Sequence, residues 1–252
     1  IFNRNTGFIT ELVSPAVENE KITSFEAGYH FKTNNFRANF NAYVTNWTDR
    51  TLSSFGQDDN GTPGDDTDDF DTTTLQRGIT QYHSGAELDV RYRATDWLSF
   101  KGFVSAGSWT YKGEAVVSTY NAETNEQIGE TSTVNRDGIK VSTAPQFTAG
   151  MGFDAKIMSG LSIDARIKYR DNHYEFTNEN TSIEDYTGAQ LGSYALTNAG
   201  ITYRFSLGNS NKMTFRANMF NVFDKVAIQQ TDRFGYFTTG GRTFNASMRY
   251  EF

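Results

Sequence analysis

The chain has 252 residues, a formal net charge of −7 and no cysteine. It contains no run of about 20 apolar residues, which excludes a helical membrane protein, and its acidic balance argues against a nucleic-acid partner. The lack of cysteine excludes a disulfide framework and thiol chemistry. Phenylalanine (21), tyrosine (13) and glycine (22) are abundant whereas proline (3) is scarce, which favours strands and turns over helices.

Residues 22–32 and 36–48 are the first predicted strands, joined by a tight turn at Asn34-Asn35. Successive side chains of a strand point to opposite faces, so Phe40 lies on an apolar face and Arg37 on a polar one. The same alternation predicts seven more strands, at residues 81–93, 97–111, 145–156, 161–176, 194–205, 212–222 and 242–252.

The connections between these strands alternate strictly between short turns and long polar stretches. The long stretches cover residues 49–79, 112–142, 178–191 and 224–241. Outer-membrane barrels have short periplasmic turns and long extracellular loops. The pattern therefore predicts an all-β protein, a transmembrane antiparallel β-barrel whose apolar face meets lipid.

The strand count is odd. With nine strands, the first strand starts outside the cell and runs towards the periplasm, whereas bacterial single-chain barrels have an even number of strands. Residues 6–14 offer a weak tenth strand, which Gly7, Glu11 and Pro15 make a poor one. An open edge in hydrocarbon leaves backbone groups unpaired at a cost of several kcal/mol each. We therefore expect residues 1–252 to be the C-terminal portion, nine or ten strands, of one larger barrel domain.

Two sequence blocks resemble a known family. Residues 218–225 (Asn-Met-Phe-Asn-Val-Phe-Asp-Lys), followed by a closing strand that ends on Phe252, resemble the end of a TonB-dependent receptor. Residues 20–29 resemble the family's Pro-Glu-Lys…Glu-x-Gly-Tyr signature, which opens the ninth strand from the end. Asn19 replaces the family proline and Ala227 a frequent tyrosine. The resemblance covers most of the chain, and a Bacteroidetes-type subfamily that works with a surface lipoprotein is one option within it.

The resemblance implies a 22-stranded barrel in the outer membrane of a Gram-negative bacterium, plugged by an N-terminal domain that is not in this sequence. Such receptors bind a scarce nutrient (siderophore, cobalamin, glycan or peptide) and import it with energy passed through TonB. The expected partners are membrane lipid, the N-terminal strands and plug of the same protein, TonB through the missing part, and a surface lipoprotein. The alternative is a structural barrel that scaffolds surface lipoproteins or a secretion or assembly complex.

Charged side chains on the polar face are the first candidate site residues. We interpret them as contacts to the plug that also set the electrostatics of the ligand path. The alternative is a solvated wall with cross-strand ion pairs worth about 1 kcal/mol or less each. The residues are Glu87, Asp89, Arg91, Arg93, Asp164, Arg166, Lys168, Arg170, Arg216, Arg249 and Glu251.

The first long polar stretch holds clustered carboxylates. Carboxylate and amide oxygens suit Ca²⁺, which takes six to eight oxygen ligands, although the spacing does not match an EF-hand loop. A solvated acidic loop is the alternative, and we expect no cofactor to be required. The residues are Asp58, Asp59, Asn60, Asp65, Asp66, Asp68, Asp69 and Asp71.

Aromatic side chains near the predicted extracellular ends form the third candidate group. In the last loop, Arg233, Phe234, Tyr236 and Phe237 could grip a ligand or partner, or pack against neighbouring loops. An interfacial girdle is the default interpretation for the aromatic residues at the strand ends. Trp47 and Trp109 have inward parity and are the candidates for ligand contact; the rest of this set is Tyr111, Tyr174 and Phe176.

Catalysis has little support in the sequence. The histidines are His30, His83 and His173, and no two of them have metal-like spacing. Asp171 and His173 are the one acid–histidine pair near the predicted outer rim. We therefore expect that the protein is not an enzyme.

Overall fold

The computed structural model describes residues 18–252, apart from residues 143, 178–180, 209–210 and 233. Every regular element in this part of the chain is a β-strand. The weak tenth strand predicted at residues 6–14 lies outside the described residues.

Among the described residues, no helix is long and apolar enough to cross a membrane.

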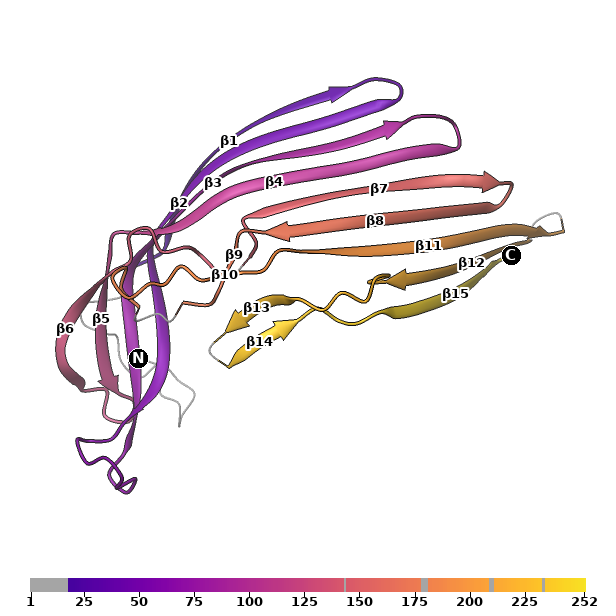
Figure 1. Cartoon of the computed structure of the whole chain (residues 1–252). Coiled ribbons are helices and arrows are strands. Elements are labelled where there is room, and N and C mark those ends of the chain that lie inside the picture. Colours follow the sequence, from indigo (N-terminus) through magenta and orange to yellow (C-terminus); the bar gives the residue numbers. More distant parts are fainter. Residues whose placement is uncertain (1–17, 143, 178–180, 209–210, 233) are drawn as a thin grey trace.

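Nine long strands form one antiparallel sheet in which each strand pairs with the next. Figure 1 shows them side by side in a curved sheet with edges at β1 and β15. All nine predicted strands are present. They are β1 (Lys21–Lys32), β2 (Phe36–Asp58), β3 (Phe70–Arg93), β4 (Leu98–Lys112), β7 (Phe147–Met158), β8 (Leu161–Asp171), β11 (Tyr194–Leu207), β12 (Asn211–Phe220) and β15 (Thr243–Glu251).

The strand register gives the sheet two chemically distinct faces. Side chains that lie opposite each other on neighbouring strands share a face, so each apolar position is extended into a row across the sheet. One such row consists of Tyr29, Phe40, Leu88, Val104, Ala149 and Tyr169. We call this the outer face; the opposite face, which carries Arg37, Asp89 and Arg166, is the inner face.

Large apolar side chains stay exposed on the outer face. Phe25 keeps 75% of its surface accessible and Met151 keeps 66%. Exposed apolar surface of this extent needs an apolar surrounding, and a lipid bilayer provides it around the whole face. The predicted division into an apolar and a polar face is therefore confirmed.

The prediction that residues 49–79 and 112–142 are loops is wrong for much of their length. β2 and β3 continue past the nine-stranded part, and β3 there pairs with β5 (Glu114–Asn121), which pairs with β6 (Gln127–Asn135). This part of the sheet, which we call the sheet extension, has buried side chains of its own on β3, β5 and the segment after β6. They are Leu75, Ile79, Ala115, Tyr120, Ile139 and Val141.

Two short hairpins complete the end of the molecule opposite the tight turns. β9 (His173–Tyr174) pairs with β10 (Gln190–Leu191), and β13 (Ile228–Asp232) pairs with β14 (Gly235–Thr238). β8 ends at Asp171 rather than at residue 176, because Asn172 adopts a left-handed backbone conformation (φ 50°) that breaks the strand.

Arginine at Ala42 should destabilise the inserted barrel far more than arginine at Asn41. Ala42 faces Ala27 and Ala86 on the outer face, where a cation near the bilayer midplane costs about 2–4 kcal/mol. Asn41 faces Glu87 on the wet inner face, so Asn41→Arg should change stability by about 0.5 kcal/mol or less. Equilibrium unfolding of the full-length protein in lipid vesicles measures both. Equal cost at the two positions would contradict the assignment of faces.

Candidate functional site

A row of cations crosses the inner face near the tight turns. Arg37 lies opposite Lys32 on one side and Arg91 on the other, and Arg91 lies opposite Lys101. The row continues through Gly152 to Arg166. We call Lys32, Arg37, Arg91, Lys101 and Arg166 the basic row.

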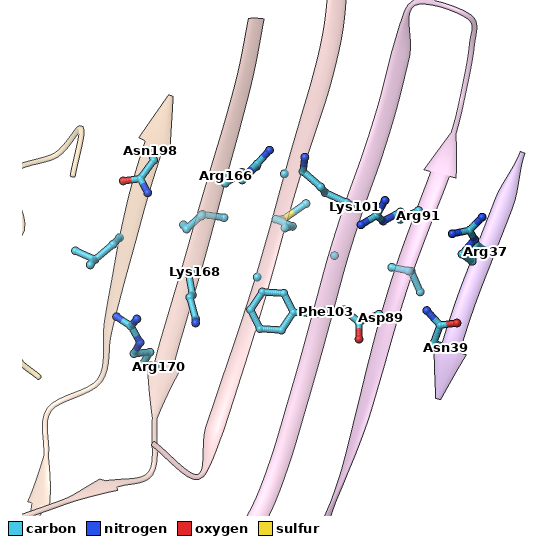
Figure 2. A pocket seen from close by; sticks show the side chains of 17 residues that line it. Arg37, Asn39, Asp89, Arg91, Lys101, Phe103, Arg166, Lys168, Arg170 and Asn198 are labelled. Carbon is cyan, nitrogen blue, oxygen red and sulfur yellow. The ribbon is translucent and has the colours of Figure 1, made fainter. Parts of the chain in front are cut away.

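A pocket with a volume of about 720 Å³ lies over Arg37, Arg91, Lys101 and Arg166 of this row. Figure 2 shows side chains from β2, β3, β4, β8 and β11 that line it. Asp89 is the one carboxylate among its described lining residues. The lining therefore has a strong excess of positive charge, supplied by Arg37, Arg91, Lys101, Arg166, Lys168 and Arg170.

Sequence reasoning did not select three members of this pocket as site residues: Arg37, Lys101 and Phe103. Lys168 lies over the Phe103 ring, with Nζ 5.7 Å from the ring centroid, a cation–π geometry. The alternation of β4 was the signal for Lys101 and Phe103, because both have the parity of Ser105, on the inner face. Phe103 was missed because its apolar ring lies on the inner face, where only charged side chains were considered as site residues.

Several predicted inner charges pair within the wall. Arg216 donates to both carboxylate oxygens of Asp164 through Nη1 and Nη2, with Nη2–Oδ2 at 3.1 Å. Its Nη1 also donates to Thr202 and its Nε to Asn218. Arg249 lies 2.9 Å from Glu251. Glu87 accepts a hydrogen bond from the Ser105 hydroxyl at 3.1 Å. The Arg216–Asp164 contact is a cross-strand ion pair of the kind expected in a solvated wall, whereas Arg249 and Glu251 belong to the same strand.

Farther from the tight turns, aromatic side chains gather on the inner face. The Trp109 indole donates a hydrogen bond to the Tyr43 hydroxyl at 3.0 Å and stacks on His83 with a centroid separation of 5.6 Å. Trp47 donates to Glu20 at 2.9 Å and lies under the Arg50 guanidinium. The structure thus gives both tryptophans the inward direction that their parity predicts, while ligand contact stays a prediction.

Glycines make room for these aromatic rings. A Cβ atom at Gly85 would lie 2.6 Å from the Tyr43 hydroxyl and 2.8 Å from the backbone oxygen of Ala106. A Cβ at Gly107 would lie 2.8 Å from the Trp109 indole nitrogen. These separations are too short for a carbon atom. Because Gly85 and Gly107 have no side chain, the aromatic rings can pack against the strand backbone at these positions.

Several carboxylates of the acidic loop between β2 and β3 accept hydrogen bonds from groups of the same loop. Asp68 accepts hydrogen bonds from the Thr62 hydroxyl at 2.8 Å and from the Asn60 amide at 3.1 Å, which lower the pKa of the Asp68 carboxyl. Asp65 accepts bonds from Thr67. Within the described ranges, no three acidic or histidine side chains converge as metal ligands. Calcium binding by Asp58, Asp59, Asp65, Asp66, Asp68 and Asp69 stays a prediction.

The β13–β14 hairpin carries the predicted loop aromatics. Phe234 is 81% exposed and Tyr236 is 64% exposed, and Phe237 is also exposed. Arg233 lies outside the described residues. Binding of a ligand or partner by this hairpin stays a prediction.

His173 lies buried in the short β9 strand with 2% of its surface exposed. Neither ring nitrogen has a hydrogen-bond partner among the described residues. Burial lowers the pKa of His173, and the charge of Arg170 lowers it further. Burial therefore favours the neutral form of the imidazole, and the pairing of β9 with β10 places Leu191 opposite it.

The two-faced sheet and its charged inner wall define the wall of an outer-membrane β-barrel. A family model described as "TonB dependent receptor-like, beta-barrel" matches residues 2–222. The chain therefore belongs to the TonB-dependent receptor family and forms part of its β-barrel. No curated protein matches the chain.

Solved structures of an import receptor and two transporters have the same fold at low identity. The ferric-catecholate import receptor Fiu of Escherichia coli K12, in its closed form, is 15% identical with a TM-score of 0.59, over 91% of this chain and 27% of that one. The copper transporter OprC is 14% identical with a TM-score of 0.61, over 93% and 32%. The outer membrane transporter YddB of Escherichia coli is 14% identical with a TM-score of 0.57, over 92% and 32%. The chain thus spans about a third of these proteins.

Alanine at Gly85 should destabilise the barrel by about 1–3 kcal/mol, because the new methyl group has no room beside Tyr43 and the Ala106 backbone. Gly28 is the matched control. It lies in β1 on the inner face, as Gly85 does in β3, and a Cβ there would meet its nearest atoms at 3.5 Å. Denaturant unfolding in vesicles compares Gly85→Ala with Gly28→Ala. A Gly85→Ala variant as stable as the control would show that the ring does not pack there.

The β9–β10 hairpin should loosen on acidification. Because the pKa of buried His173 lies below that of the unfolded chain, its stabilising effect is complete above about pH 6.5 and declines as the pH falls below that value. Hydrogen exchange of residues 172–192 measures this loss, which His173→Leu should remove. Identical pH dependence in the two proteins would contradict the role of His173.

Proposed function

We propose that this chain forms part of the wall of an outer-membrane receptor that takes up a scarce nutrient with energy from TonB. One observation carries the proposal: a membrane-facing apolar surface is combined with an inner face whose pocket contains six cations and one carboxylate. A purely structural wall has no need for this charge excess. A path for a polar or charged ligand needs such an excess, because fixed charges along a water-filled channel determine which solutes pass through it.

Family membership supports the same function. Receptors of this family are outer-membrane proteins of Gram-negative bacteria and work with TonB and a plug. Among the similar structures, one is a ferric-catecholate import receptor and another a copper transporter. The candidate nutrients for this chain are a siderophore, cobalamin, a glycan or a peptide. The proposal includes no catalytic step.

The proposal assigns the parts of the wall to different tasks. Further strands of the same protein close the barrel between β15 and β1, since unpaired strand edges in hydrocarbon are costly. The sheet extension, the acidic loop and the β13–β14 hairpin then lie outside the cell and meet the ligand first. Trp47 and Trp109 line the path below them, and the basic row lies near the periplasmic end.

Growth of the native bacterium under nutrient limitation tests the function. Deletion of the complete gene and deletion of TonB should cause the same growth deficit on one nutrient class, offered as iron–siderophore, cobalamin, glycan or peptide. Reintroduction of the intact gene should restore growth only where TonB is present. A deficit that is independent of TonB would contradict energised uptake and favour the scaffold alternative, in which the barrel holds surface lipoproteins or an assembly complex.

A further inference from the structure

The sheet extension ends in an edge strand. Among the described residues, β6 pairs with β5 on one side and with no strand on the other. Figure 1 shows β6 as the outermost strand of the extension, and the residues from Glu130 to Thr133 are exposed. A strand in this position presents N–H and C=O groups to any chain that lies beside it.

Two backbone hydrogen bonds define which groups of β6 point outwards. The Arg136 N–H donates to the Gly113 oxygen at 2.9 Å, on the side of β5. The backbone groups of successive residues in a strand point alternately to its two sides, so those of Asn135 and Thr133 point away from β5. The Asn135 oxygen accepts a hydrogen bond from the Ile183 N–H at 2.7 Å. This side of β6 is therefore able to bond the backbone of another segment.

Beyond that single contact, the C-terminal half of β6 stays open. In the part of the chain that the structure describes, no backbone other than that of Ile183 bonds the outward groups of Ser132–Asn135. β6 also contains neither lysine nor proline, two residues that commonly protect an exposed edge. Its first half differs, because the ladder shifts register there and the Gln127 side chain donates to the Gly129 oxygen. We call Ser132–Asn135 the open edge.

The surface around the open edge is acidic. Residues 114–137 contain one cation, Arg136, which is buried. Asp137 pairs with Lys112 at 3.4 Å. The other carboxylates of this range are exposed and form no ion pair within the described ranges; they are Glu114, Glu123, Glu126 and Glu130.

The open edge and the carboxylates together define the kind of group that fits. Backbone pairing at an edge requires an extended chain, and its main-chain hydrogen bonds give affinity. The carboxylates select among extended chains, because they attract lysine and arginine side chains and repel acidic ones. Glu130, two residues from the open edge, is close enough to contact such a side chain. The matching occupant is an extended, basic polypeptide segment.

The charge of the barrel interior indicates that this segment is not the transported ligand. The pocket on the inner face has six cations and one carboxylate among its described lining residues. A basic segment that the carboxylates of the hairpin attract is repelled in that pocket. The occupant of the open edge therefore belongs to a second protein that stays outside the cell.

We propose that the open edge of β6 binds an extended, basic segment of a second protein, which joins the sheet extension as a further strand. Main-chain hydrogen bonds to Thr133 hold the segment, and its cations lie against the carboxylates around Glu130. The inference requires that the sheet extension lies outside the cell, and it is independent of nutrient uptake.

A synthetic strand peptide tests the backbone pairing. The probe alternates lysine and threonine over about six residues, a usual strand length, and fluorescence anisotropy measures its binding to the full-length protein in nanodiscs. Thr133→Pro removes an outward N–H and leaves the ladder to β5 intact, so it should weaken binding about tenfold. Thr133→Ala keeps the backbone and is the matched control, which should bind the probe as the unsubstituted protein does.

A change in the probe alone keeps this test independent of receptor folding. N-methylation of the peptide backbone removes its hydrogen-bond donors and should abolish binding to the unsubstituted protein. Binding of the methylated probe, or equal binding by Thr133→Pro and Thr133→Ala, would overturn the proposal.

The charge requirement has a separate test. Glu130→Gln should weaken binding of the lysine probe about two- to fivefold, as expected for an exposed ion pair, and high salt should weaken it further. A probe with glutamate in place of lysine should not bind. Equal affinity for the two probes would overturn the assignment of a basic partner.

Growth on the probe distinguishes a partner segment from a nutrient. The lysine probe, offered to the native bacterium as its nitrogen source, should support no TonB-dependent growth. TonB-dependent growth on it would show that the peptide is cargo and would overturn the assignment to a second protein. Probe binding by a protein whose deletion causes no TonB-dependent growth deficit would preserve this contact and reject the proposed uptake.

Discussion

The structure depends on the pairing of backbone groups between strands that carry apolar side chains on one face only. In hydrocarbon, each N–H and C=O group must be bonded within the protein, and the ladders from β1 to β15 provide this for every inner strand of the sheet. Once the ladders are in register, the pleat fixes the direction of each side chain. Every functional feature of the inner face, from the aromatic cluster to the basic row, follows from this register.

Most of the membrane-spanning wall could be predicted from the sequence because lipid and water impose opposite demands on adjacent residues. In the structure, the residues around Phe40 and Met151 lie on the faces that their alternation predicts. The sheet extension was missed because its sequence has no sustained alternation of apolar and polar residues. Its buried positions include polar groups such as Gln76 and Ser118, and its strands have the composition of a loop. The β-branched run in β5, including Val116 and Val117, was the available signal.

The candidate site was predictable only in part. Parity placed Asp89, Arg91 and Arg166 on one face, but strand register decides which charges lie opposite each other, and residues far apart in sequence meet there. The alternation gave no means to align Arg37 with Arg91, or to distinguish them from Arg216, whose charge Asp164 neutralises. The close approach of Gly85 and Gly107 to the rings of Tyr43 and Trp109 could not be predicted for the same reason, because it also depends on strand register.

Site-directed fluorescence tests the two-sided wall most directly. The 252 residues contain no cysteine. Once every cysteine elsewhere in the full-length protein is replaced, a single cysteine at Phe40, Met151, Asn39 or Lys168 can carry a bimane label in lipid vesicles. The account predicts that brominated lipid quenches the label at Phe40 and Met151, whereas aqueous iodide quenches it at Asn39 and Lys168. Quenching by iodide at Phe40 and Met151, with lipid quenching at the other two, would contradict it.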